Sequence, residues 1–98
     1  MNAPAPSAAL SSSTDLAVAR ALATAWWTST VAGWSPDERV DGDTPVVGRC
    51  DVYQIDAGEH AGSTCYHFTL GFESGGSTGD VPVIRTAGGF GWVVQSNG

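Results

Sequence analysis

The stretch that decides the fold spans residues 64–73 and reads Thr-Cys-Tyr-His-Phe-Thr-Leu-Gly-Phe-Glu. Every second side chain in it is large and apolar, and these side chains are Tyr66, Phe68, Leu70 and Phe72. Because successive side chains of a β-strand point to opposite faces of a sheet, this period of two predicts a strand with one apolar face. Such a strand is stable only where other elements cover that face, so the rest of the chain must supply a larger sheet and a covering layer.

Three further segments are rich in strand-forming residues and are separated from this one by turn signals. We predict strands over residues 46–55, 81–86 and 90–95, in addition to the strand at 64–73. The connections contain Asp56-Ala57-Gly58-Glu59, the Gly/Ser-rich run 74–79 and the pair Gly88-Gly89. Since these connections are short, sequential strands pair antiparallel, and the predicted sheet is a four-stranded meander.

The segment 13–33 precedes the strands and has the pattern of a helix. Ser13 is a candidate N-cap, Asp15 lies in the first turn, where the helix dipole favours an acid, and Gly33 ends the helix. At 100° per residue, one face gathers Leu16, Ala19, Ala23, Trp26, Trp27, Thr30 and Trp34. We therefore predict an α+β domain over residues 13–98, with one N-terminal helix packed on the sheet. Residues 1–12 are predicted to be a flexible Ala/Pro/Ser-rich tail or linker.

The charge balance excludes some classes of partner. The chain of 98 residues contains ten acidic residues and four basic ones, all arginine, and its net charge is −6. Phosphate backbones repel such a surface, so we expect no nucleic-acid partner, and anionic membranes are disfavoured for the same reason. No apolar run approaches the roughly 18 residues that cross a bilayer, so we expect no direct membrane insertion of this segment.

Cys50 and Cys65 lie on two strands that are predicted to be neighbours. If they face each other across the ladder, Val47 faces Phe68, and we predict a disulfide between the two cysteines. A bridge closing a loop of about 15 residues would add about 3 kcal/mol to the stability of a small core. It would also indicate an extracytoplasmic setting, at the cell surface or secreted. Two buried free thiols are the alternative, with a cytoplasmic or virion setting.

Two constellations have the residue types of metal sites. Cys65 and His67 lie two residues apart on one face of a strand, and Cys50 and His60 would complete a four-ligand zinc site. The spacing matches no Cys-x-x-Cys pattern, however, and the acidic loop around Asp41-Gly42-Asp43 lacks the spacing of an EF-hand calcium loop. We therefore predict neither a metal site nor another cofactor.

Nucleophile and acid–base signals are present but poorly placed. Residues 75–79 fit the Gly-x-Ser-x-Gly pattern around Ser77, but that motif requires a sharp turn from a strand into a helix, and a strand is predicted to follow here. His60, beside Glu59, lies at a predicted turn, and His67 lies on a strand surface. We therefore predict no catalytic residue, and an enzyme is the less favoured class.

Aromatic side chains supply the candidate contact surface. The chain has four tryptophans, three of them on or just after the predicted helix. At least two are expected in the core, where large side chains compensate for a short chain. A candidate face for a ligand or a protein partner remains, and its residues are Tyr66, Phe68, Phe72, Trp92 and Trp34.

The order of one helix and four antiparallel strands resembles the cystatin-like architecture and its NTF2-like relatives. Residues 81–94, which read Val-Pro-Val-Ile-Arg-Thr-Ala-Gly-Gly-Phe-Gly-Trp-Val-Val, look like the closing hairpin of many small NTF2-like domains. Residues 45–48, Pro-Val-Val-Gly, are similar in part to the inhibitory hairpin of cystatins. The chain has room for only one of the helices that form the cone of NTF2-like enzymes, so the resemblance implies mainly a fold.

The favoured function is a non-catalytic protein-interaction or assembly domain, because each catalytic or metal pattern fails on spacing or context. An extracytoplasmic component of a bacterial surface or secretion apparatus, or a small virion structural protein, fits this description, with a protein partner or self-assembly. The resemblance implies two alternatives. One is a domain that binds a small apolar ligand or acts as an NTF2-type isomerase, and the other is a cystatin-like peptidase inhibitor.

Overall fold

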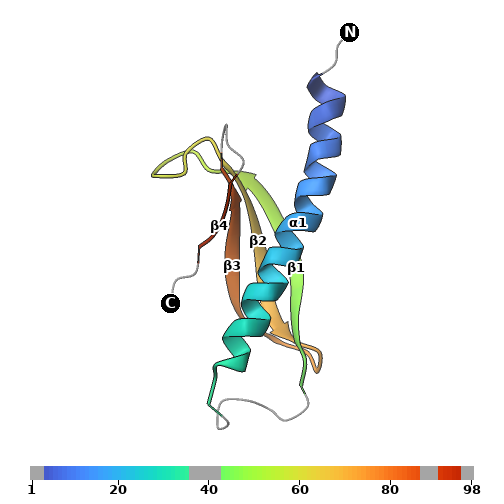
Figure 1. Cartoon of the computed structure of the whole chain (residues 1–98), viewed down its shortest axis with the longest axis vertical. Helices are drawn as coiled ribbons and strands as arrows, with labels where there is room; N and C mark the ends of the chain where they lie inside the picture. The colour runs from blue at the N-terminus through green and yellow to red at the C-terminus, as the bar shows by residue number, and fades with distance from the viewer. Residues whose placement is uncertain (1–3, 36–42, 87–90, 96–98) are drawn as a thin grey trace.

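The chain folds into one helix and four strands over the residues that the computed structural model describes, which are 4–35, 43–86 and 91–95, with helix side chains from Thr14 onward (Figure 1). The elements are α1 (Pro4–Ala32), β1 (Pro45–Gln54), β2 (Thr64–Phe72), β3 (Ser77–Arg85) and β4 (Trp92–Val94). The predicted α+β class, with an N-terminal helix on a four-stranded antiparallel sheet, is confirmed.

The strands follow one another across the sheet in the order β1-β2-β3-β4, as the predicted meander. Phe68 at the centre of β2 pairs with Cys50 on one side and with Val81 on the other. β3 begins at Ser77, inside the run that the sequence predicts as a loop, because β2 extends far enough to pair with it. β4 is shorter than the predicted strand over 90–95, and the Gly88-Gly89 pair lies outside the described residues.

A β-bulge divides β1 between Val47 and Cys50. Val47 pairs with Leu70 and Cys50 with Phe68, so Gly48 and Arg49 together lie opposite Thr69. The Arg49 main-chain N–H donates to Thr69 Oγ1 at 2.9 Å. A Cβ atom at position 48 would lie 2.6 Å from that same oxygen. Glycine at this position therefore lets the Thr69 hydroxyl reach the main chain of the bulged strand.

The turn between β2 and β3 is fixed by glycine and by an acid from a distant loop. Gly75 and Gly76 adopt φ angles of 115° and 78°, which only glycine adopts readily. Asp43 accepts hydrogen bonds from the Ser74 main-chain N–H at 3.1 Å and from the Ser74 hydroxyl at 2.7 Å. One acid of the candidate calcium loop is therefore a structural anchor, while residues 41 and 42 lie outside the described residues.

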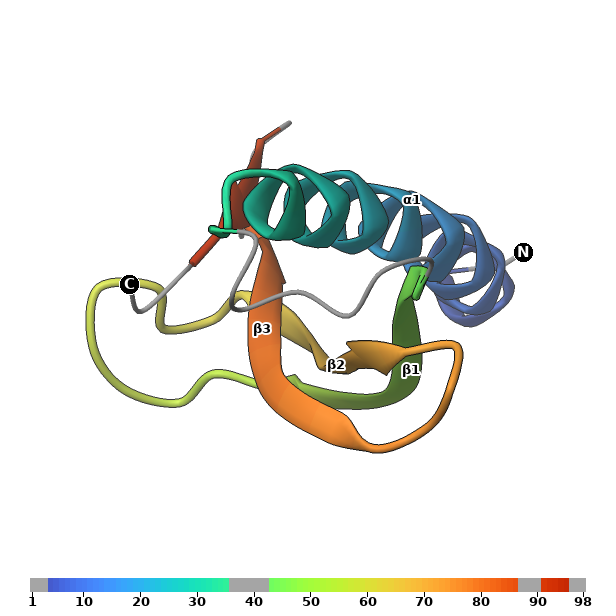
Figure 2. The same ribbon diagram turned by 90° about the horizontal axis from the view of Figure 1, so that it is seen from below.

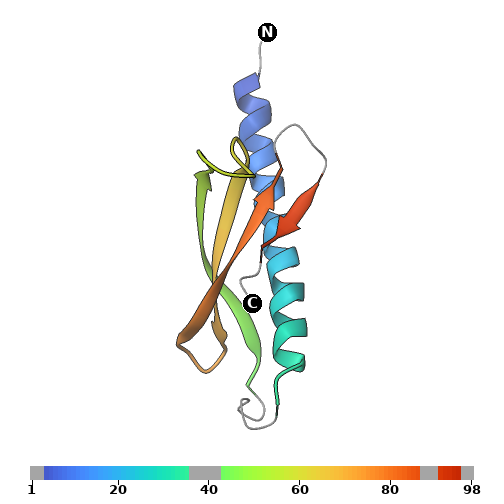
Figure 3. The same cartoon turned by 90° about the vertical axis from the view of Figure 1, so that its left-hand side faces the viewer.

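The helix α1 lies across one face of the sheet and extends beyond it at its N-terminal end (Figures 1 and 3). It begins at Pro4, before the predicted start at residue 13, so its backbone includes residues 4–12 of the predicted tail. Its 29 residues span about 43 Å at 1.5 Å per residue, whereas the 10 residues of β1 span about 33 Å. The domain boundary at residue 13 stays a prediction.

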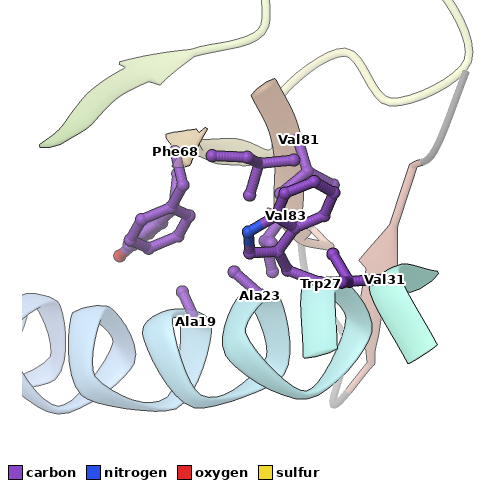
Figure 4. Close-up of a cluster of buried hydrophobic side chains, with 9 residues drawn as sticks. Ala19, Ala23, Trp27, Val31, Phe68, Val81 and Val83 are labelled. Atoms are coloured by element: carbon purple, nitrogen blue, oxygen red, sulfur yellow. The ribbon is translucent and has the colours of Figure 1, made fainter. Parts of the chain in front are cut away.

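The core lies between α1 and the sheet face that α1 covers (Figure 2). The helix contributes one buried side chain per turn, and these are Ala19, Ala23, Trp27 and Val31. The sheet contributes Tyr66, Phe68, Leu70, Val81 and Val83. Figure 4 shows the helix side chains directed at Phe68, Val81 and Val83. The contacts between the helix and this face of the sheet therefore form the hydrophobic core.

Candidate functional site

The face predicted to bind a ligand or partner is the face that α1 covers. Tyr66 and Phe68 are 3% and 0% exposed and belong to the core. Phe72, Trp34 and Trp92 are half-buried and pack against that core. The Trp34 ring centroid lies 5.9 Å from that of Phe72, and the Trp92 centroid lies 6.0 Å from that of Tyr66. The two central residues of this face therefore have no surface left for an apolar ligand.

The predicted disulfide is not formed, because the two cysteines lie on opposite faces of the sheet. Cys50 pairs with Phe68 and Cys65 pairs with Tyr53, so the predicted pairing of the two cysteines is wrong, and both thiols are free. The connection sets this register, since the Ile55 N–H donates to the Ser63 carbonyl at 2.9 Å. Burial raises the pKa of each thiol, so neither is an activated nucleophile.

The other sequence candidates are also separated or differently placed. Cys50 lies on the helix side of the sheet, away from Cys65 and His67, and the described residues contain no group of three metal-ligating side chains. Ser77 begins β3 rather than a helix, so the context of a nucleophile turn is missing. The segment 45–48 lies within β1, paired with β2, and not in a projecting hairpin loop.

Three polar side chains form a hydrogen-bonded chain on the outer face, the side of the sheet that α1 does not cover. Tyr53 Oη on β1 lies 3.0 Å from His67 Nδ1 on β2. His67 Nε2 lies 2.6 Å from Asp80 Oδ2 on β3. This Tyr53–His67–Asp80 chain therefore ties three neighbouring strands together across the outer face.

The partners assign the hydrogen positions in the Tyr53–His67–Asp80 chain. An ionised carboxylate can only accept, so His67 Nε2 carries the proton that it donates to Asp80. The other nitrogen, Nδ1, faces the Tyr53 hydroxyl, and which of the two donates depends on the tautomer of the imidazole. The order of hydroxyl, imidazole and carboxylate is that of a hydrolase triad, with a phenol in place of the serine.

The environment of Tyr53 does not suit a nucleophile. Hydrogen bonding with Cys65, and then burial, raises the pKa of Tyr53 to about 12. A catalytic nucleophile or base needs a pKa shifted toward the working pH, which is the opposite direction for a phenol. Tyr53 therefore keeps its proton, and the Tyr53–His67–Asp80 chain, which we name the clamp, holds the phenol in position through its two contacts of 3.0 and 2.6 Å.

Titration of the phenol groups tests the environment of Tyr53. Burial also raises the pKa of Tyr66, the second of the two tyrosines, so we expect neither phenol to ionise near the usual value of about 10. Tyr53→Phe should remove the ultraviolet titration step at about pH 12. Because the folded state holds this proton more tightly than the unfolded state, the stabilisation is complete below about pH 10 and is lost as the pH rises toward about 12. An ultraviolet titration step near pH 10 that disappears in Tyr53→Phe would contradict the contact of Tyr53 with Cys65 and its burial.

β1 is an edge strand, and a side chain of the helix covers part of the edge that faces away from β2. The Arg20 guanidinium on α1 donates to the main-chain carbonyls of Val47 and Gly48 at 3.2 and 3.0 Å. The same guanidinium carbon lies 5.1 Å from the centroid of the Phe68 ring, which holds the arginine over the sheet. Arg20 therefore caps the edge of β1 at the bulge.

Beyond the bulge, no strand among the described residues pairs with the side of β1 that faces away from β2 over residues 50–54, which we name the open edge. The main chain of Ile55 faces the connection to β2, because its N–H donates to the Ser63 carbonyl. Main-chain groups alternate in direction along a strand of an antiparallel ladder. The groups that point away from β2 are therefore those of Cys50, Val52 and Gln54.

Exposed hydrophobic side chains gather on the open edge. Val52 is 55% exposed and Tyr53 is 45% exposed. Among the described residues, the other large hydrophobic side chain that is exposed is Val18 of α1, at 38%. Val52 and Tyr53 are adjacent and lie on opposite faces of the sheet, so a strand added at the open edge would contact both.

Sequence reasoning misses both features. It treats Tyr53 only as part of a predicted strand and His67 as a surface residue, and it assigns no role to Asp80. The signal for the Tyr53–His67–Asp80 chain is weak, because it depends on the register between three strands. The signal for the open edge is the order of the strands in the sheet, which leaves β1 with one partner strand.

Comparison of the chain with protein-family models, with curated proteins and with solved structures found no match. The class of protein that the structure defines is a small α+β domain whose apolar sheet face is filled by its own helix.

Proposed function

We propose that this domain is a non-catalytic protein-interaction or assembly module that docks a partner strand on the open edge. One observation carries the proposal. The stretch of β1 whose main-chain groups point outward, at Cys50, Val52 and Gln54, also carries the two most exposed large hydrophobic side chains of the described residues, Val52 and Tyr53. A docked strand would bury these side chains and would gain main-chain hydrogen bonds at the same time.

The two halves of β1 differ in how they resist such docking. Folded proteins protect their edge strands with proline, bulges, charges or covering side chains. The first half of β1 has Pro45, the bulge and the Arg20 cap. The open edge has a single charged residue, Asp51, which lies 3.6 Å from the Arg49 guanidinium in an exposed ion pair. The open edge is therefore the less protected half.

The clamp fixes the side chain of Tyr53 before a partner binds. Its hydroxyl is bonded to His67, so the ring is already held in place on the outer face. Less side-chain freedom is then lost when a partner covers it. Tyrosine is also among the side chains that interfaces favour, because it offers a large apolar ring and a polar end. His67 and Asp80 therefore support binding by positioning the ring of Tyr53.

The remaining expectations follow as proposals. The element order supports a cystatin-like or NTF2-like architecture as the origin of the fold. Two free cysteines on opposite faces support a cytoplasmic or virion setting, such as a small virion structural protein, over an extracytoplasmic one.

In the described part of the chain, no helix combines the length and the apolar character that crossing a membrane requires. The buried face and the position of residues 45–48 leave the ligand-binding and inhibitor alternatives without support.

Val52→Pro tests the proposal, because it removes a main-chain N–H that points only to the open edge and leaves the pairing with β2 intact. We expect the domain to stay folded by circular dichroism. A photoreactive residue at position 54 should crosslink the wild-type chain to one discrete protein in the cells that make it. Val52→Pro should reduce that adduct about tenfold or more, as expected from a loss of about 1.4 kcal/mol or more.

The control places the same photoreactive residue at Ser29, which is exposed on α1. Equal adducts from positions 54 and 29 would contradict docking at the open edge. An adduct at position 54 that survives Val52→Pro would contradict it as well. Turnover of a small molecule in the absence of any adduct would overturn the non-catalytic assignment.

A further inference from the structure

We propose that the occupant of the open edge is a second copy of this chain, paired antiparallel about a two-fold axis at Val52. This inference rests on the proposed function and names its partner. Two four-stranded sheets would then join through their β1 strands into one continuous sheet, with a helix on each half. Strand addition between identical edges is a common route to a symmetric dimer.

The main-chain geometry selects the register. Outward groups lie at Cys50, Val52 and Gln54, so a two-fold axis at Val52 places each of them opposite an outward group of the other copy. An axis at Cys50 would instead place Val52 opposite Gly48, whose carbonyl already accepts from Arg20 at 3.0 Å. The Arg20 cap therefore excludes that register and leaves the one that uses the whole open edge.

The side chains fit the same register. Val52 meets Val52 of the second copy on the helix side, which buries the most exposed of the large hydrophobic side chains described. Asp51 meets Tyr53 of the second copy on the outer face, so no like charges stand opposite each other. An axis at Asp51 would set two carboxylates against each other, which is unfavourable. The register at Val52 is therefore self-complementary in hydrogen bonding, burial and charge.

Net charge gives the dimer a diagnostic salt dependence. Each copy carries a net charge of −6, so long-range repulsion opposes the approach of two copies at low ionic strength. Added salt screens this repulsion, and self-association should strengthen severalfold between low and physiological ionic strength. A basic partner would show the opposite trend, because salt weakens attraction between opposite charges. The contact is small, so the dimer should be weak and concentration-dependent.

The experiment compares two exposed valines by sedimentation velocity over a range of concentration and salt. Wild type should shift from monomer to dimer as either is raised. Val52→Lys should stay monomeric, and Val18→Lys, which adds the same charge to α1, should dimerise like wild type. A wild-type chain that stays monomeric, or two lysine variants that behave alike, would overturn the inference. Circular dichroism checks that both variants are folded.

Disulfide trapping tests the register independently. In a Cys50→Ser background, Val52→Cys should form an intermolecular disulfide severalfold faster than Val18→Cys, because paired residues on a two-fold axis lie within disulfide range. The wild-type Cys50 should crosslink more slowly, since it lies opposite Gln54 of the second copy. Faster crosslinking through Cys50 would overturn the register. If self-pairing fails while the position 54 adduct with another protein persists, the second copy is excluded and the docking function stands.

Discussion

Replacing Phe68 with alanine is expected to lower the free energy of unfolding by about 3–5 kcal/mol. Phe68 is 0% exposed and lies at the centre of β2, where it meets the helix and the neighbouring strands. The loss combines the transfer of the ring to water with the cavity left between α1 and the sheet. A domain of this size has about 5–15 kcal/mol in total, so the variant should be partly unfolded at moderate temperature.

Urea denaturation followed by circular dichroism measures this effect. The matched control is Val52→Ala, which also truncates an apolar strand residue but at an exposed position, and it should cost less than about 1 kcal/mol. Since the Phe68 ring also holds Arg20 over the sheet, Phe68→Ala should loosen the Arg20 cap. Similar losses for the two variants would show that the face covered by α1 is not the core.

The second large effect is expected at Trp27, which is 3% exposed and fastens the end of α1 to the end of β2. Its Nε1–H donates to the Gly71 carbonyl at 2.8 Å, and its ring centroid lies 5.4 Å from Trp34 and 5.6 Å from Phe72. Trp27→Phe leaves that buried carbonyl without its donor and leaves a cavity beside the ring. We expect a loss of about 2–4 kcal/mol, combining about 1–3 kcal/mol for the hydrogen bond with the cavity term.

Trp26→Phe is the matched control, because Trp26 is the adjacent tryptophan, is half-buried and stacks at 6.4 Å on Trp27. It should cost less than about 1.5 kcal/mol. Thermal or chemical unfolding followed by far-ultraviolet circular dichroism gives both values. A loss at Trp26 equal to that at Trp27 would contradict the specific role of the hydrogen bond to Gly71.

The main features of the fold could be predicted because they depend on local periodicity. The alternation from Tyr66 to Phe72 defines β2, and the spacing of Ala19, Ala23 and Trp27 defines the buried side of α1. Short connections then require a meander. The same reasoning failed at β3, because residues 77–79 are weak strand formers and pair only because β2 lies beside them.

The cysteines and the candidate site could not be predicted, because both depend on register. The connection between β1 and β2 sets which residues face each other, and this places Cys65 opposite Tyr53 rather than Cys50. A shift of an odd number of residues also moves a side chain to the opposite face. The Tyr53–His67–Asp80 chain depends on the register of β1 with β2 and on that of β2 with β3, so no local sequence pattern predicts it.

The open edge was missed for a different reason. The sequence indicates that Val52 and Tyr53 belong to a strand, but the sequence pattern alone does not show that β1 is the first strand in the order of the sheet. The Arg20 cap likewise joins residues far apart in the chain, so the division of β1 into a capped and an open half appears only in three dimensions. The proposed function thus rests on the features that depend most on tertiary structure.

Amide hydrogen exchange, resolved by residue in the dilute protein, shows directly whether the second half of β1 has an unpaired edge. An open edge should give alternating protection along this half of β1, with fast exchange at Cys50, Val52 and Gln54 and slow exchange at Asp51 and Tyr53. If a second copy docks on the open edge, raising the protein concentration should slow exchange at Cys50, Val52 and Gln54. Slow exchange at Cys50, Val52 and Gln54 in the dilute monomer would contradict docking at the open edge, because the edge would already be paired within the chain itself.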